Sequence, residues 1–177
     1  MNPIIAAVHT HEDFGHALQS PVDFVFLMSA NILTLKEYAD AAHQDVKKLF
    51  VHADMMQGIG RDSHGVEYIS KMGADGIIST RSNILKMARE QGLETVQRFF
   101  IIDFHSVETA IQAVKTQKPD MIELMPGVVP KVIAHFSQSV KVPIITGGLI
   151  ETKQEIIQAL QAGADAVSTS NMRLWQD

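Results

Sequence analysis

The sequence predicts an α/β fold, a compact single-domain (β/α)₈ TIM barrel with short loops that spans residues 1–177. Eight short apolar runs rich in Val, Ile and Phe recur along the chain, as buried parallel strands do. Longer segments with helical periodicity separate these runs, and strict alternation of strand and helix favours a parallel sheet. Because 177 residues shared among eight units leave about 22 residues for each, the loops must be short.

The predicted strands are apolar enough to be covered on both faces. Pro143 opens the seventh run, at a strand position that tolerates proline. Pro21 and the stretch 29–33 blur the boundaries of the first two units. In chain order the runs are Ile4–Val8, Phe24–Met28, Leu49–Val51, Gly76–Ile78, Thr95–Ile102, Met121–Leu124, Pro143–Thr146 and Ala166–Ser168.

The segments between the strands carry helix start and stop signals. Thr152 followed by Glu155 has the spacing of a capping box. Gly92 and Gly163 stand just after periodic segments, where a left-handed residue commonly ends a helix. The predicted helical segments are Leu33–His43, Val66–Met72, Ser82–Gln91, Val107–Lys115, Val128–Gln138 and Lys153–Ala162.

Two stretches of the sequence echo each other. Gly73-Ala74-Asp75 and Gly163-Ala164-Asp165 each precede a predicted strand, and each strand is followed by Ser-Thr and a Ser/Asn-containing turn. One explanation is duplication of a half-barrel. The alternative is that Gly-Ala-Asp before a strand is a common solution in barrels and recurs by chance.

Composition excludes several classes of protein. Apolar residues make up 46% of the chain and charged residues 20%, and the absence of cysteine removes disulfides, thiol nucleophiles and thiolate metal sites. The first residues do not resemble a signal peptide, and no apolar run approaches the roughly 20 residues of a membrane span, so we expect a cytoplasmic protein without a membrane partner. The net charge of −5 gives no support for bulk electrostatic binding of nucleic acid. The eight histidines show no metal-ligand spacing, and no metal site is predicted.

The strongest chemical motif lies after the last two predicted strands. Thr146-Gly147-Gly148 follows the seventh strand, and Ser168-Thr169-Ser170-Asn171 follows the eighth. Phosphate-binding barrels often place the anion in these two loops. Glycines let backbone N–H groups approach an anion, and a hydroxyl cluster that opens a helix adds donors and the positive end of the dipole. A tight turn and a simple helix cap would explain the same residues without a ligand.

Polar residues at strand ends form a second group. Asp54 follows the third strand, Glu123 interrupts the sixth and Arg98 interrupts the fifth. Burying a charge without a partner is costly, so each should be paired or hydrogen-bonded. Asp54 and Glu123 could accept hydrogen bonds from ligand hydroxyls while Arg98 balances their charge, or Arg98 and Glu123 could form a structural ion pair. Gly127, in the turn after the sixth strand, could deliver backbone N–H groups to the mouth of the barrel.

The sequence leaves RNA-contacting residues undetermined. Arg81, Lys86 and Arg89 are the best local cluster, but a solvated helix face explains them more simply. No aromatic residues are interleaved with basic ones along the sequence, as a single-strand platform would require. An enzyme that uses Asp54 and Glu123 as an acid/base pair on a small phosphorylated substrate is the alternative from a different class.

Several long motifs then match a known family in one order. They are His52-Ala53-Asp54 through Gly58-Ile59, Gly76 through Asn83, Gln97-Arg98-Phe99-Phe100, Glu123 through Gly127 with Pro130, Gly147-Gly148-Leu149-Ile150, Ser168 through Asn171, and Leu174-Trp175. On these motifs the chain, from about Pro3 to Trp175, resembles the glycerol uptake operon antiterminator regulatory protein family.

The resemblance implies a regulator and not an enzyme. Members of this family respond to glycerol 3-phosphate and act on the leader mRNA of a glycerol-metabolism operon, which implies transcription antitermination, RNA binding and no cofactor besides that ligand. A homo-oligomer is possible. His9 stands near a place where the family often has Arg or Lys, and it would hold anion charge only when protonated. On this reading Gly147, Gly148, Ser168, Thr169 and Ser170 hold the phosphate, and the glycerol end and mouth are formed by Asp54, Arg98, Glu123 and Gly127.

Overall fold

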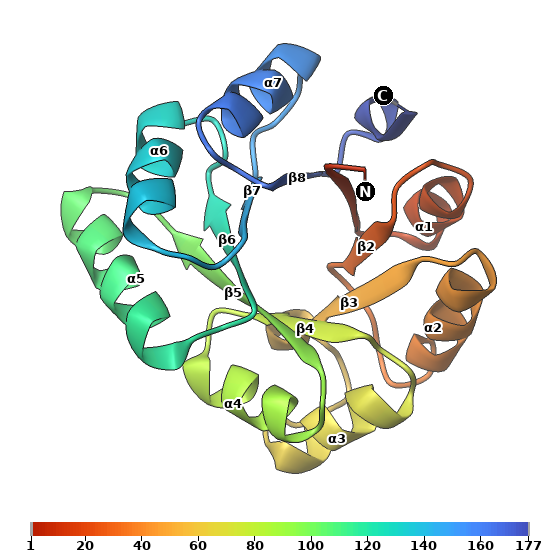
Figure 1. The fold of residues 1–177 in the computed structure, drawn as a ribbon. Coiled ribbons are helices and arrows are strands. Elements are labelled where there is room, and N and C mark those ends of the chain that lie inside the picture. The colour runs from red at the N-terminus through yellow and green to blue at the C-terminus, as the bar shows by residue number, and fades with distance from the viewer. Residues whose placement is uncertain (1, 177) are drawn as a thin grey trace.

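The computed structural model describes residues 2–176, in which eight parallel strands form a closed barrel in sequence order. The first strand pairs with the eighth, and helices surround the strands (Figure 1). The predicted TIM-barrel fold is therefore confirmed, and every predicted strand overlaps an observed one. The strands are β1 (Ile4–Val8), β2 (Phe24–Leu27), β3 (Lys48–His52), β4 (Gly76–Ser79), β5 (Glu94–Phe100), β6 (Met121–Met125), β7 (Ile144–Gly147) and β8 (Ala166–Thr169).

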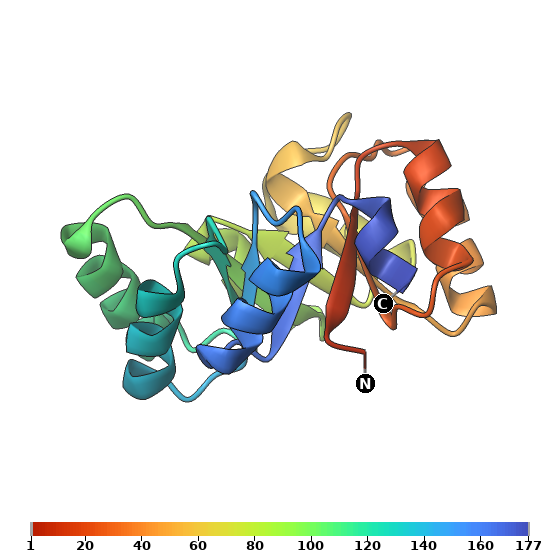
Figure 2. The same cartoon turned by 90° about the horizontal axis from the view of Figure 1, so that it is seen from above.

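Each predicted helical segment also overlaps an observed helix. The capping box of Thr152 and Glu155 is present, and Gly92 and Gly163 have φ values of +75° and +107°, as predicted. In the side view, α5 and α6 lie to the left of the strands, α7 lies in front of them, and α1 and α2 lie to the right (Figure 2). The helices are α1 (His11–Leu18), α2 (Leu35–Gln44), α3 (Ser63–Lys71), α4 (Ser82–Glu90), α5 (Phe104–Gln117), α6 (Pro130–Ser139) and α7 (Lys153–Gln161). Short 3₁₀ helices are η1 (Ala53–Met55) and η2 (Met172–Gln176). None of the helices within residues 2–176 has the length and apolarity that a membrane crossing requires.

The first and the last helix of the chain, α1 and η2, differ from the prediction. Helix α1 was not predicted, because its sequence HEDFGHAL buries only Phe14 and Ala17 and so carries a weak apolar period. Its N-terminus is well defined, since Thr10 and Asp13 form a capping box. After β8 the predicted helix is a five-residue 3₁₀ helix, η2, which fills the place between α7 and α1 (Figure 1). Leu174 and Trp175 of η2 are buried there.

The interior of the barrel changes character along its axis. Six residues from different strands pack into one apolar cluster: Ile5, Phe26, Phe50, Ile78, Val96 and Ile145. Alternate residues of a strand share a face, so the positions two residues further along face the same interior. Those positions include His52, Arg98 and Gly147. The carboxyl-end layer of the interior is therefore polar, above an apolar layer.

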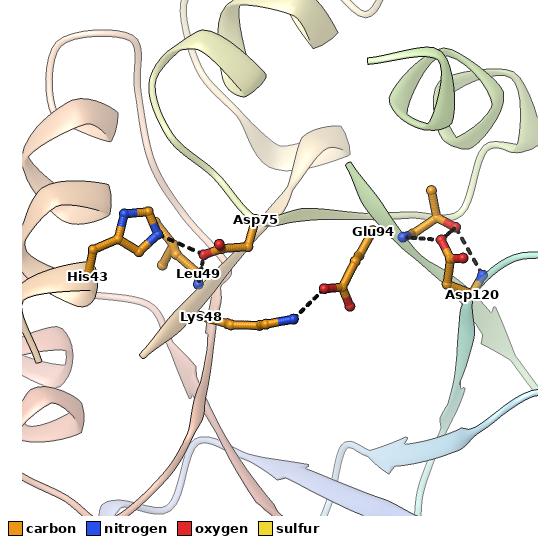
Figure 3. Close-up of polar contacts among 7 residues, drawn as sticks. His43, Lys48, Leu49, Asp75, Glu94 and Asp120 are labelled. Atoms are coloured by element: carbon orange, nitrogen blue, oxygen red, sulfur yellow. Dashed lines mark hydrogen bonds and ion pairs between the residues drawn. The ribbon is translucent and has the colours of Figure 1, made fainter. Parts of the chain in front are cut away.

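The amino ends of the strands are fastened by a repeated aspartate contact. The Oδ2 atom of Asp75, just before β4, accepts a hydrogen bond of 2.8 Å from the backbone N–H of Leu49 in β3 (Figure 3). Equivalent contacts precede the other even-numbered strands, so the aspartates of the two Gly-Ala-Asp stretches belong to a set of four such contacts within residues 2–176. The remaining three are Asp23 to Asn2 (2.8 Å), Asp120 to Thr95 (2.9 Å) and Asp165 to Ile144 (2.8 Å).

Replacing Asp75 with alanine should lower the free energy of unfolding by about 1–3 kcal/mol, because it leaves the N–H of fully buried Leu49 without its acceptor. Urea denaturation measures this change. Asp40→Ala is the control, since Asp40 pairs only across the exposed surface of α2 with Lys36, and it should cost less than about 0.5 kcal/mol. Equal effects of the two substitutions would contradict a fastening role for Asp75.

Candidate ligand site at the carboxyl ends of the strands

A cavity of about 250 Å³, here called the mouth cavity, opens at the carboxyl ends of the strands. Among the nine residues predicted for the site, Gly148, Ser168, Thr169, Ser170, Arg98 and Glu123 line it. The rest of its wall lies outside those nine residues and comes from the ends of β1, β2 and β6 and from the loop after β7; of these residues the sequence had singled out His9 alone, as a possible holder of anion charge. These further residues are Ala7, His9, Met28, Met125, Leu149 and Ile150.

A buried ion pair forms the floor of the mouth cavity. Arg98 Nε donates to Glu123 Oε2 at 2.7 Å, and the two residues stand opposite each other in the pairing of β5 with β6. Glu123 is fully buried and Arg98 is 6% exposed. The Ser168 hydroxyl donates to Glu123 Oε1 at 2.6 Å, so both carboxylate oxygens are occupied. The structural ion pair considered from the sequence is thus present, and it lies within the cavity wall.

The guanidinium of Arg98 has N–H groups that its bond to Glu123 does not use and that can donate to a ligand. Arg98 Nη2 lies 3.6 Å from the sulfur of Met28, a weak acceptor, and Glu123 binds only the Nε edge. A guanidinium presents N–H groups in a planar fork that suits oxyanions. Arg98 can therefore bind an anion while Glu123 and Ser168 hold its side chain in place.

The loop after β7 is strained next to this floor. Gly148 and Leu149 have φ values of +76° and +60°, and the second is unusual for a residue with a side chain. A Cβ on Gly148 would lie 2.8 Å from the Met125 side chain, and a Cβ on Gly147 would lie 2.1 Å from the Ser168 hydroxyl. A side chain at Gly147 or Gly148 would force a neighbour to shift, and positive φ values outside glycine, as at Leu149, gather at functional sites.

Gly127 supports this loop from the neighbouring one. Its N–H donates to the carbonyl of Gly147 at 2.6 Å and to that of Gly148 at 3.2 Å. The preceding Met125–Pro126 peptide bond is cis. Gly127 was predicted to offer N–H groups to the mouth. In the described chain its N–H instead holds the Gly147-Gly148 backbone, and Gly127 lies outside the cavity wall.

The Ser168–Asn171 segment is an ordered turn. The Thr169 hydroxyl donates to the Ile150 carbonyl at 3.0 Å and accepts the Asn171 N–H at 3.1 Å, so it joins the loops after β7 and β8. Trp175 Nε1 fixes the same turn by donating to the Thr169 carbonyl at 2.8 Å. One part of the expectation is wrong: the turn leads into the five-residue η2 and not into an α-helix, so no full helix dipole points at the cavity.

Asp54 has partners away from the mouth cavity. Its carboxylate accepts from the Ser79 hydroxyl at 2.6 Å and from the N–H and hydroxyl of Thr80 at 2.8 and 2.9 Å. Burial favours the protonated form, but these hydrogen bonds outweigh burial and keep the pKa of Asp54 below its ordinary value. Within the described chain Asp54 does not line the cavity, and its oxygens connect β3 to the turn after β4. Asp54 and Glu123 are therefore not arranged as an acid/base pair that shares a substrate.

His52 is a buried interior residue that the sequence did not single out. It is 6% exposed, and its Nδ1 atom is buried without a hydrogen-bond partner among the described residues. Burial, and then the nearby Arg98 charge, lower the pKa of His52 to about 4. The signal was available in the alternation of β3, because His52 follows Phe50 by two positions and must share its face.

Because the pKa of His52 falls from 6.5 when unfolded to about 4 when folded, the unfolded chain binds the extra proton between these values. The free energy of unfolding should therefore be unaffected by His52 above pH 6.5. It should fall by about 3 kcal/mol as the pH is lowered towards 4. Urea denaturation of the wild type and of His52→Gln across this range isolates the effect, since other groups titrate in both proteins. Parallel pH profiles for the two proteins would contradict it.

A closed parallel barrel with a polar, anion-suited cavity at its carboxyl ends defines a small-ligand-binding TIM barrel. Residues 4–175 match the family described as glycerol-3-phosphate responsive antiterminator, and the chain belongs to this family.

Relatives agree with this assignment. A glycerol uptake operon antiterminator regulatory protein from Listeria monocytogenes, known from a crystal structure, has 33% sequence identity to this chain. The two structures match with a TM-score of 0.91 over 97% of this chain and 94% of that one. A glycerol uptake operon antiterminator-related protein from Thermotoga maritima is also 33% identical, with a TM-score of 0.89 and 99% of each chain covered. An uncharacterized protein of Escherichia coli K12, YgcP, is 33% identical over 98% of this chain and 92% of its own length.

Enzymes are similar in fold alone. A deoxyribose phosphate aldolase from Aeropyrum pernix has a TM-score of 0.76 at 14% identity, covering 98% of this chain and 88% of that one. The fold is shared between regulators and enzymes, so it does not decide the activity.

Proposed function

We propose that this chain is a regulator that binds glycerol 3-phosphate in the mouth cavity and promotes transcription past a terminator by binding leader mRNA of a glycerol-metabolism operon. The observation that carries the proposal is the buried Arg98, locked by Glu123 beneath the glycine-rich loop after β7 in a member of the antiterminator family. A cavity of about 250 Å³ suits a three-carbon phosphoester.

The phosphate is held between the loops after β7 and β8. Gly148 leaves room for an oxyanion to approach the backbone, and Ser170, which is exposed and lines the cavity, supplies a hydroxyl. The Thr169 hydroxyl is occupied by Ile150 and Asn171, so Thr169 contributes by keeping the two loops together. The Arg98 fork supplies the positive charge.

The glycerol end lies over the apolar side of the cavity, where Ala7, Met28 and Ile150 face it. Glu123 positions Arg98 and Ser168 by accepting one hydrogen bond at each of its carboxylate oxygens. Glycerol without phosphate should therefore bind weakly, since it cannot use Arg98 or the glycine loop. This discrimination is what a sensor of the phosphorylated compound requires.

Ligand changes RNA binding only if it binds the RNA-competent state more tightly than the other state. Titration of fluorescently labelled leader RNA with the protein, with and without saturating glycerol 3-phosphate, tests the coupling. We expect roughly a five- to 150-fold tightening, the ordinary range for allosteric coupling between two sites. An RNA affinity that the ligand leaves unchanged would contradict the proposed mechanism.

A further inference from the structure

Three large apolar side chains are exposed together at the carboxyl end of β5. Phe100 ends the strand, and Ile102 and Phe104 lie on the turn into α5; they are 60%, 85% and 74% exposed. Ile102 and Phe104 line the same hollow, and exposed apolar side chains that lie together mark interaction sites more often than scattered ones do. The cluster lies on the same face of the barrel as the mouth cavity.

The turn that presents these side chains is rigidly built. Ser106 and Asp103 form a capping box at the start of α5, and the Ser106 hydroxyl also accepts the Ile102 N–H at 3.0 Å. The Ile101 N–H donates to the Met125 carbonyl at 2.8 Å, which ties the turn to β6. The exposure of Ile102 and Phe104 is therefore fixed by hydrogen bonds, and not the result of a loose loop.

A second hollow of about 250 Å³, here called the β5–β6 hollow, lies beside this turn. Phe104 and Pro126 contribute to its apolar wall, while Asp103 and Lys131 bring charge to it. Lys131 Nζ lies 6.0 Å from the centre of the Phe104 ring, within the range of a cation–π contact. The two residues are far apart in the sequence, which is why no aromatic-basic platform could be predicted from it.

Resting on the proposed function, we infer that the β5–β6 hollow binds an unpaired nucleobase of single-stranded RNA, with Phe104 as the stacking ring and Lys131 as the contact to the neighbouring phosphate. Exposed aromatic rings beside a cation are the usual elements of single-strand recognition. The net charge of −5 gives no bulk attraction to an RNA backbone, so recognition at the hollow rests on contacts to a base and on the Lys131 cation. Asp103 offers a carboxylate acceptor to the amino edge of a base.

A second copy of this chain fits the hollow less well. A stable interface between two copies buries about 800 Å² on each partner, which three exposed apolar side chains cannot supply alone.

The β5–β6 hollow is connected to the mouth cavity by one short segment. Met125 lines the mouth cavity, and the next residue, Pro126, lines the hollow. Gly127 then holds the Gly147-Gly148 loop through its N–H. Residues 125–127 therefore contribute to the wall of the mouth cavity, to the wall of the hollow and to the contact with the Gly147-Gly148 backbone, so the two sites are neighbours.

Fluorescence anisotropy with labelled leader RNA, at saturating glycerol 3-phosphate, tests the inference with three variants. Phe104→Leu keeps an apolar side chain but loses the stacking ring, and should weaken RNA binding about tenfold. Phe104→Tyr keeps the ring and should retain the affinity within about threefold, as expected for stacking. Leu33→Ala is the matched control, because Leu33 is 86% exposed on the loop after β2 and should change nothing.

The outcomes separate this inference from the proposed function. RNA binding by Phe104→Leu at wild-type affinity would overturn the nucleobase hollow and leave the proposed function standing. Wild-type protein that binds glycerol 3-phosphate but no leader RNA would overturn both RNA claims. Loss of a wild-type dimer in Phe104→Leu, seen by analytical ultracentrifugation with RNA affinity unchanged, would assign the hollow to a second copy of the chain instead.

Discussion

Replacing Glu123 with alanine should lower the free energy of unfolding by about 3–5 kcal/mol, because it leaves the Arg98 charge buried without its partner. Glu123 is fully buried and Arg98 is 6% exposed, so the carboxylate is the main compensation for the buried guanidinium charge. The Ser168 hydroxyl loses its acceptor at the same time. Urea denaturation followed by far-UV circular dichroism measures the change.

Two further variants show whether the loss comes from the buried ion pair itself. Glu94→Ala removes a carboxylate from the exposed pair with Lys48, and should cost less than about 1 kcal/mol. The double variant Arg98→Met with Glu123→Leu removes both charges and should recover most of the lost stability, since apolar replacement of a buried pair is often neutral or stabilising. A double variant as unstable as Glu123→Ala would show that the pair itself is not the cause.

Gly148→Asp should weaken binding of glycerol 3-phosphate by about 100-fold or more. The substitution places a carboxylate where the phosphate is proposed to approach. Like charges placed side by side cost several kcal/mol of binding free energy, and about 1.4 kcal/mol corresponds to a tenfold change in Kd. A side chain at this position also meets Met125, whose methyl group would lie 2.8 Å from the new Cβ. Calorimetric titration measures the loss.

Gly92→Asp is the matched control for backbone strain. Gly92 has a φ of +75°, almost the +76° of Gly148, but a Cβ there would meet nothing within 4 Å. Both variants therefore share the cost of a left-handed aspartate, while only one lies at the mouth cavity. Equal ligand affinities for the two variants would show that the loop after β7 does not hold the anion.

Most of the fold could be predicted because it rests on local signals. The strands are apolar on both faces, and caps such as Thr152 and turns such as Gly163 mark the helix ends. Helix α1 was missed since its burial is slight, and η2 was expected as an α-helix since only the Ser/Thr/Asn turn before it is visible in sequence. In both places tertiary contacts, and not the spacing of apolar residues in the sequence, determine which secondary structure forms.

The site could be predicted only in part for a related reason. The glycine motif after β7 and the hydroxyl motif after β8 are each a short continuous stretch of sequence. Residues of both line the same cavity in the structure. Ala7 and Met28 join the same cavity through closure of the barrel, and nothing in their local sequence distinguishes them from core residues. Asp54 resembled a ligand contact because it ends a strand, but Ser79 and Thr80 on the next unit satisfy it. Long-range pairing of this kind is not encoded in spacing.

Isothermal titration calorimetry with glycerol 3-phosphate, with glycerol and inorganic phosphate as controls, tests the central claim most directly. We predict saturable binding of the phosphoester, at least tenfold tighter than either control, since the phosphoester combines the Arg98 and glycine-loop contacts with burial of the three-carbon end. No binding of any of the three, or equal binding of glycerol and glycerol 3-phosphate, would contradict the assignment of the mouth cavity as the sensor site.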